Sequence, residues 1–257
     1  MKARRPLPML VLGIVAVMAS ACSSVTPNTT ASANGSGPSH VYVALGENGE
    51  GNPRFLANVG DGWTQMFYRS ALGTSGTFYD LSMPDQTVAD VLAQELGQAQ
   101  AVHPDLVTVW LSTADIVDGT DPGTYGTELR QLISALRRQG ATVLVANAVP
   151  PTLESAFATC TQRFDGCSAP DPASSSVVLS PSALASAVTV YDRTIASVAH
   201  QTGALLVDVH SVLVQALEGG GVGGILAPDG SSLSEQGSAL VARAFLHTLP
   251  ASFTERR

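Results

Sequence analysis

The sequence contains few charged residues, few aromatics and few cysteines, and each of these low counts excludes a class of protein or partner. Of 257 residues, 13% are charged and 5% aromatic, and 13 Lys and Arg face 21 Asp and Glu. Nucleic acid is not an expected partner, because phosphate binding needs a basic face. Three Cys are too few for a disulfide-rich scaffold. What remains is a 45% hydrophobic chain, long enough for one large domain with a single packed core.

The first 22 residues have the pattern of an export signal. A basic head of Lys2, Arg4 and Arg5 precedes an apolar stretch over 9–18, which is too short for a stable membrane span. Small residues then precede Cys22, an arrangement that resembles a bacterial lipobox. We therefore expect a lipoprotein anchored through Cys22 at the outer face of the bacterial cytoplasmic membrane. The alternative is an ordinary secretory signal, which would make the protein secreted.

The segment after the signal has the composition of a flexible tether. Residues 23–39 are mostly Ser, Thr, Asn, Gly and Pro, without charge. We expect a folded domain over 40–250 and a tail over 251–257. Removal of the signal would leave ten Arg, no Lys and 21 acids, a net charge of −11. The mature chain would then not be drawn electrostatically to anionic lipid.

Two further cysteines, Cys160 and Cys167, lie in a polar segment with six residues between them. In an exported protein, this arrangement favours one small-loop disulfide. A metal pair is the weaker alternative, because no His and no further Cys lies nearby in the sequence.

Apolar runs bounded by turn signals recur along the domain. They cover 41–45, 77–81, 105–111, 141–149 and 203–209. Near-continuous apolar runs are typical of strands covered on both faces. Helical patterns separate them, so the sequence predicts a doubly wound parallel sheet with helices on both faces, a three-layer α/β sandwich. In such a fold, sites form beyond the carboxyl ends of the strands.

Several helix boundaries are also predicted. Ser180 and Pro181 are expected to open one helix as cap and first-turn proline, and Gly140 to end another. Further helices are expected after Asp61 and after Thr87. The last expected helix carries one apolar face formed by Val241, Ala244, Phe245 and Leu249.

Four sequence blocks, taken in order, resemble the SGNH (GDSL-like) hydrolase family over about residues 40–249. They are VYVALGENG from Val41, DLSMPDQTVADVL from Asp80, PDLVTVWLSTADI from Pro104, and APDGSSLSEQGSALVARAF from Ala227. No block alone is specific, but their order and spacing are similar to those of the family. The resemblance implies a five-stranded, flavodoxin-like parallel sheet, the SGNH hydrolase fold.

The family's functional positions hold unusual residues in this chain. Active members use a Ser of the first block as nucleophile, a His of the last block as general base, an Asp that orients this His, and Gly and Asn of the middle blocks as oxyanion donors. The corresponding positions here are Glu47 and Asn48 in the first block, Asp85 in the second, Ser112, Ala114 and Asp115 in the third, and Asp229 and Ser232 in the last. By this resemblance, only the orienting Asp229 is kept.

These residues make the family reaction improbable. The Asn48 amide is no useful nucleophile, and Ser232 cannot accept a proton near neutral pH as an imidazole can. Ala114 has no side-chain donor for a developing oxyanion. Asp85 would bring negative charge towards that site.

Other residues of the chain are candidates to replace the lost groups. His40, His103, His200 and His247 are not expected at the carboxyl edge. His210 is the histidine expected near a strand's carboxyl end, where packing at the start of the following helix is the favoured role. Ser231, Ser232 and Ser234 resemble a nucleophile cluster, but Ser232 and Glu235 have the spacing of a capping box, which is the stronger interpretation.

A cation site at the same edge is a further hypothesis. Glu47, Asp85, Asp115 and Asp229 are all expected near this edge, and clustered carboxylates suit Ca²⁺ or Mg²⁺. Against it, Asp229 would be tied to neighbouring backbone and Asp115 would cap the turn after its strand. No other cofactor is implied.

Three hypotheses on function follow. The first is an exported lipoprotein whose SGNH-like domain is catalytically inactive and serves as a binding or structural module at the cell envelope, with an envelope glycan or lipid as a possible ligand. The second is an esterase with a rebuilt active site that acts on envelope acyl or glycan esters. The third is a binding module that depends on a divalent cation. The sequence does not indicate the oligomeric state.

Overall fold

The computed structural model describes most of the expected domain. The described residues are 40–46, 59–73, 76–150, 153, 180–220, 224–228 and 232–254. The chain divides into two compact units, 1–35 and 36–257, and every described residue belongs to the second. The signal and most of the tether, as well as Cys22, Cys160 and Cys167, lie outside the described residues.

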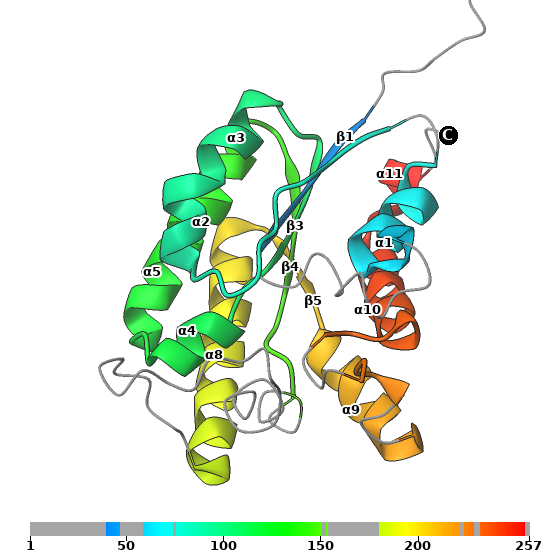
Figure 1. Cartoon of the computed structure of the whole chain (residues 1–257). Coiled ribbons are helices and arrows are strands. Elements are labelled where there is room, and N and C mark those ends of the chain that lie inside the picture. The colour runs from blue at the N-terminus through cyan, green and yellow to red at the C-terminus, as the bar shows by residue number, and fades with distance from the viewer. Residues whose placement is uncertain are drawn as a thin grey trace, which may run out of the picture. The chain divides into compact units, whose positions relative to one another are not determined.

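Five parallel strands form a single sheet (Figure 1). They are β1 (Val41–Gly46), β2 (Thr77–Asp80), β3 (Leu106–Trp110), β4 (Thr142–Ala146) and β5 (Leu205–Val207). Their order is β2-β1-β3-β4-β5, and all four pairings are parallel. The structure thus confirms the five predicted strands and the flavodoxin-like sheet. The order reverses between β1 and β3, which is where such folds place their sites.

Helices cover both faces of the sheet, as Figure 1 shows. One layer comprises α2 (Val88–Gln94), α3 (Leu96–Ala101), α4 (Thr113–Asp118), α5 (Pro122–Arg137) and α8 (Pro181–Thr202). The other comprises η1 (Val59–Asp61), α1 (Trp63–Ala71), α9 (Val209–Gly220), α10 (Glu235–Thr248) and α11 (Ala251–Thr254). Successive side chains of a strand point to opposite faces of the sheet. In β1, Val43 and Leu45 pack in the core under the first helical layer, whereas Tyr42 and Ala44 pack under the second.

Local signals explain where the helices begin and end. Ser180 is the N-cap of α8, with Pro181 in its first turn, and Thr87 caps α2 in a capping box with Asp90. Gly140, just beyond α5, has a φ of +92°, a conformation that favours glycine. These boundaries follow the sequence prediction.

Two boundaries differ from the prediction. Val209 was expected in the last strand but begins α9, because Asp208 accepts a hydrogen bond from the Ser211 N–H (3.0 Å), as an N-cap residue does. The segment expected as a tail begins with α11, whose Phe253 ring packs against His40 at a centroid distance of 4.9 Å. Packed structure therefore continues to residue 254. Among the described residues, no helix is both long and apolar enough to span a membrane.

Candidate functional site at the carboxyl ends of the strands

The first block of the family pattern ends in a tight contact between β1 and β3. Gly46 closes β1 with a φ of +122°, and a Cβ at this position would lie 2.1 Å from the Trp110 carbonyl oxygen. The Gly46 carbonyl accepts a hydrogen bond from the Met83 N–H (2.9 Å), which ties the end of β1 to the segment after β2. Only glycine fits here. Glu47 and Asn48 follow directly but lie outside the described residues.

The end of β2 carries a carboxylate with several donors. Asp80 accepts hydrogen bonds from the Thr64 hydroxyl (2.9 Å) and from the N–H and hydroxyl of Ser82. Burial raises the pKa of Asp80, although these hydrogen bonds oppose the shift. Asp85, at the family's glycine position, is exposed and has a φ of +59°. Its left-handed backbone is the conformation that a glycine adopts readily.

The end of β3 places the third block in the interior. Ser112 is fully buried and is the N-cap residue of α4, and Ala114 lies in the first turn of that helix. The methyl group of Ala114 offers no hydrogen-bond donor.

Asp115, also buried, connects two helices. Its Oδ2 accepts a hydrogen bond from the Val88 N–H at the start of α2 (3.0 Å). Burial raises the pKa of Asp115 to about 6, and Val88 and Thr120 oppose this shift by hydrogen bonding. Its carboxylate therefore holds α2 against α4, rather than capping only the turn after its own strand as expected.

The last block differs from its predicted local structure. The N-cap of α10 is Ser234, whose Oγ accepts from the Gly237 N–H (3.0 Å) and donates to the Gly224 carbonyl (2.9 Å). The predicted capping box of Ser232 and Glu235 is therefore wrong. Residues 226 and 233 form an antiparallel bridge, which extends the chain past Ser232 and moves the helix start by two residues. Asp229 lies outside the described residues.

The expected cation site has little support in the described part of the chain. There, no group of three or more His, Cys, Asp and Glu residues is arranged to hold a metal ion. Asp85 is exposed, whereas Asp115 is buried and bonded to the start of α2. The other two expected ligands, Glu47 and Asp229, are not described.

A buried glutamate lies beside the end of β1. Glu95, between α2 and α3, is 2% exposed, and neither carboxylate oxygen has a hydrogen-bond partner of normal geometry. Burial raises the pKa of Glu95 to about 7; the nearby Gly46 backbone opposes the shift, and Asp80 and Asp90 add to it. The sequence analysis missed this residue, since no local pattern separates it from the exposed acids of a helix.

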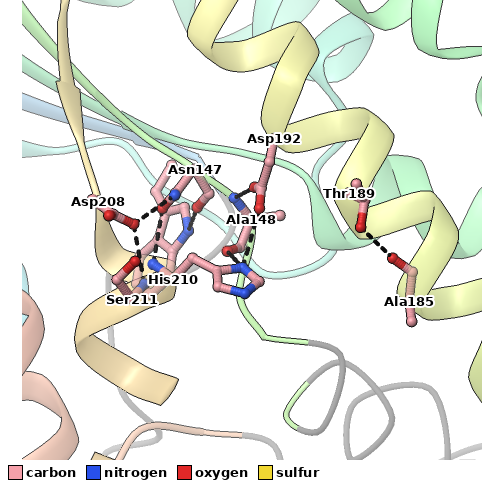
Figure 2. Close-up of polar contacts among 9 residues, drawn as sticks. Asn147, Ala148, Ala185, Thr189, Asp192, Asp208, His210 and Ser211 are labelled. Atoms are coloured by element: carbon pink, nitrogen blue, oxygen red, sulfur yellow. Dashed lines mark hydrogen bonds and ion pairs between the residues drawn. The ribbon is translucent and has the colours of Figure 1, made fainter. Parts of the chain in front are cut away.

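A polar network joins the ends of β4 and β5 (Figure 2). His210, in the first turn of α9, directs its ring Nδ1 to Asp192 Oδ2 on α8 (3.1 Å) and to the Ala148 carbonyl (3.2 Å). The other oxygen of Asp192, Oδ1, accepts from the Ala148 N–H (2.8 Å). One carboxylate thus holds both the imidazole and the segment after β4.

The backbone around His210 is held by a second set of bonds. Asn147 Oδ1 accepts from the His210 N–H (2.9 Å), and Asn147 Nδ2 donates to Asp208 (2.9 Å). The Asn147 carbonyl accepts from the Trp110 indole (3.1 Å), which extends the network to β3. Sequence reasoning placed His210 at this edge and at a helix start, but it missed Asn147, Asp192 and Asp208.

The network determines the protonation of His210. Its pKa is raised, first by the hydrogen bond to Asp192, whereas burial opposes the shift. Both neighbours of Nδ1 are acceptors, so Nδ1 carries the proton in the neutral ring, and Nε2 keeps its lone pair. Nε2 makes no hydrogen bond to a described residue. For Asp208, burial raises the pKa, but the bonds from Ser211 and Asn147 outweigh it and the pKa is lowered.

The fold and this edge define the class of protein: a flavodoxin-like α/β domain with polar groups beyond the carboxyl ends of its strands. The GDSL-like Lipase/Acylhydrolase family matches residues 33–223, and the chain belongs to this family. The matched range ends before Asp229 and Ser232. A comparison with curated proteins finds no match.

Solved structures with a similar fold include several named as esterases or hydrolases. TesA is 19% identical with a TM-score of 0.59, covering 82% of this chain and 99% of TesA. LAE5, an α/β hydrolase from the metagenome of Lake Arreo, Spain, is 17% identical with a TM-score of 0.60, covering 81% and 94%. A catalytic mutant of Axe2, an acetylxylan esterase from Geobacillus stearothermophilus, is 18% identical with a TM-score of 0.58, covering 81% and 93%. At these identities the similarity shows the shared fold.

Proposed function

We propose that this chain is an exported, lipid-anchored member of the family that has lost serine-based ester hydrolysis and serves as a binding module at the cell envelope. The observation that carries the proposal is the chemistry of the described family positions. Ala114 has no donor where the family has an Asn, and Ser232 has no imidazole where the family has a His. The sequence adds Asn48 at the nucleophile position. Three roles of acyl transfer lack a suitable group.

The contacts of His210, beside the ends of β4 and β5, support the same conclusion. His210 Nδ1 is bound to Asp192 and Ala148, and its Nε2 makes no hydrogen bond to a described hydroxyl. A serine hydrolase needs such a bond between base and nucleophile, although this bond is often loose in the free enzyme. Several of the similar solved structures are named as esterases, and these names describe those proteins and not this chain.

Hydrolysis of short acyl esters tests the proposal. We expect the purified mature protein to release p-nitrophenol from p-nitrophenyl acetate at the background rate. The Asn48→Ala variant should give the same rate. Robust turnover that disappears in this variant would overturn the proposal.

A hydrolase with a rebuilt site is the second candidate, favoured by the His210–Asp192 pair. A carboxylate on Nδ1 and a lone pair on Nε2 form the base half of a catalytic dyad. This candidate predicts turnover that disappears in His210→Gln and persists in Asn48→Ala. Labelling by a fluorophosphonate, which reacts with an activated serine, would further indicate a serine nucleophile.

Lipid anchoring is tested separately. We expect metabolic labelling with a fatty acid to mark the chain expressed in a bacterial host, and Cys22→Ser to abolish the label. Labelling that persists in Cys22→Ser would contradict anchoring at this residue.

A further inference from the structure

A pocket lies between α1 and α10, in the helical layer that Figure 1 shows beside the sheet. It has a volume of about 290 Å³ and is lined by Met66, Arg69, Ser70, Ala239, Ala242, Arg243 and Leu246. This volume is near the lower end of small-molecule sites, which span roughly 300–1,000 Å³. The pocket therefore suits a small ligand.

The pocket follows from how the two helices pack. Their inner sides interlock through aromatic rings: Trp63 stacks on Phe245 at a centroid distance of 4.5 Å, and Phe67 meets the same ring at 5.9 Å. Towards the pocket, α10 contributes Ala239 and the buried Ala242, whose small side chains leave the space open. Met66 and Leu246 add apolar surface, so most of the lining suits an alkyl chain.

Two arginines, one from each helix, give this pocket a positive charge. Arg69 donates to the Gly60 carbonyl and lies 3.9 Å from an Asp61 carboxylate oxygen, so its charge is partly compensated. Arg243 is exposed and forms no ion pair or hydrogen bond with a described residue. No acidic side chain lines the pocket. In a chain with a net charge of −8, these two side chains form a local positive region.

The pocket is separate from the family's functional positions at the carboxyl ends of the strands. Helices of this layer run antiparallel to the strands, so the start of α10 lies near the carboxyl edge of the sheet. Ala239 and Leu246 are four and eleven residues beyond the first residue of α10, which is about 6 to 16 Å along its axis. A ligand here would not occupy the position of Ser232.

A second pocket, between α5 and α8, also has two arginines but a more polar lining. Its lining includes Arg130 and Arg193, but Arg130 donates to Gln201 (2.9 Å). Much of the remaining lining is small or polar, with Gly123, Gly126, Thr194 and Ser197. The lining there is more polar than that of the α1/α10 pocket, and Arg193 serves as a matched control for Arg243.

We propose that the α1/α10 pocket binds a small anionic amphiphile, an alkyl chain with a carboxylate or phosphate head. Arg243 and Arg69 bind the head through charge-assisted hydrogen bonds, and Met66 and Leu246 contact the chain. The inference is independent of whether the family site hydrolyses esters.

Equilibrium binding of decanoate and decyl phosphate to the full chain tests this proposal. The Cys22→Ser background keeps a covalent acyl chain from competing. We expect at least one of the two anions to bind, and 1-decanol and acetate to bind at least tenfold more weakly, because each lacks one half of the ligand. The tighter of the two anions identifies the head group.

Variants locate the site. Arg243→Gln should weaken the anion about tenfold or more, and Ala239→Leu should weaken both the anion and decanol by filling the pocket. Arg193→Gln should leave binding unchanged, and circular dichroism should show that all three variants are folded. Absence of binding by both anions, equal binding of decanol, or equal effects of the two arginine variants would overturn the proposal. Polyglutamate that binds with the same dependence on Arg243 would instead assign the pocket to an acidic protein.

Discussion

At the scale of single residues, the protonation of Glu95 links the stability of the fold to pH. Its folded-state pKa of about 7 exceeds the ordinary value of 4.5, so the folded state binds this proton more tightly than the unfolded state. The stability that depends on this proton is therefore complete below about pH 4.5 and is lost as the pH rises to about 7. A rise in pKa of this size corresponds to roughly 3 kcal/mol.

Glu95→Gln should remove this pH dependence. The neutral amide resembles the protonated acid in shape, so we expect similar stability to wild type at pH 5 and a gain of about 3 kcal/mol at pH 8. Urea unfolding at both pH values measures the difference. Glu218→Gln, at an exposed position, is the control and should change little at either pH. Equal effects of the two substitutions would contradict the role given to burial.

The His210–Asp192 pair should have a pH dependence in the same direction as Glu95, but at higher pH. Because the pKa of His210 is raised, the stabilisation from this pair is complete below the unfolded histidine value, near pH 6.5, and is lost as the pH rises through the folded value. We expect Asp192→Asn to destabilise the fold by about 1–3 kcal/mol at pH 5.5 and by less at pH 8.5.

An NMR titration of the histidine ring measures this coupling directly. The Asp192→Asn variant should lower the pKa of His210, since the carboxylate that favours the imidazolium is gone. His200→Gln, at an exposed position on α8, should leave the His210 titration unchanged. A His210 pKa that does not respond to Asp192→Asn would show that this contact is absent in solution.

At the scale of elements, the start of α10 distinguishes between two neighbouring serines. Ser234 Oγ accepts from the Gly237 N–H, whereas Ser232 precedes the helix by two residues. Ser234→Ala should therefore cost about 1 kcal/mol of unfolding free energy. Ser232→Ala should cost less, and thermal or urea unfolding compares the two. A larger loss in Ser232→Ala would restore the capping box expected from the sequence.

The elements that sequence could predict are those set by local chemistry. The apolar runs predicted all five strands, and Ser180 with Pro181 predicted the start of α8, because each signal involves neighbours in the chain. Contacts between distant residues were not predictable in this way. Asp192 lies in the middle of a helix, and nothing near it in sequence indicates that it meets His210.

The candidate site was predicted less completely than the fold. The resemblance located Ser112, Ala114 and Ser232 at the carboxyl edge, but not the burial of Ser112. The predicted capping box failed because the residues before α10 pair with 226 and delay the helix start. Such pairing depends on tertiary packing, which overrides a local motif.

At the scale of the whole molecule, the fold and the catalytic chemistry depend on different residues. The sheet order, the helical layers and the tight Gly46 contact depend on residues that pack, and the sheet and its layers have the fold of the similar solved structures. The groups that would move protons or stabilise an oxyanion occupy only a few positions, which follow the strands in the sequence. Changing them leaves the core intact, so the same fold can carry a different function.

This separation predicts how hydrolysis could be restored. In the double variant Asn48→Ser, Ser232→His, the nucleophile and base return, but Ala114 still offers no oxyanion donor. We expect its hydrolysis of p-nitrophenyl acetate to stay within about tenfold of background. Adding Ala114→Asn should raise the rate by about 10²-fold, the typical contribution of one such donor.

A fourth substitution tests whether the restored activity uses the family geometry. Asp229→Asn, added to the triple variant, removes the carboxylate that would orient the new histidine, and we expect most of the gain to disappear. If the gain survives Asp229→Asn, the new serine is activated in another way. If the triple variant stays at background while remaining folded, the carboxyl edge has diverged beyond these positions, since restoring the lost side chains alone does not rebuild the site.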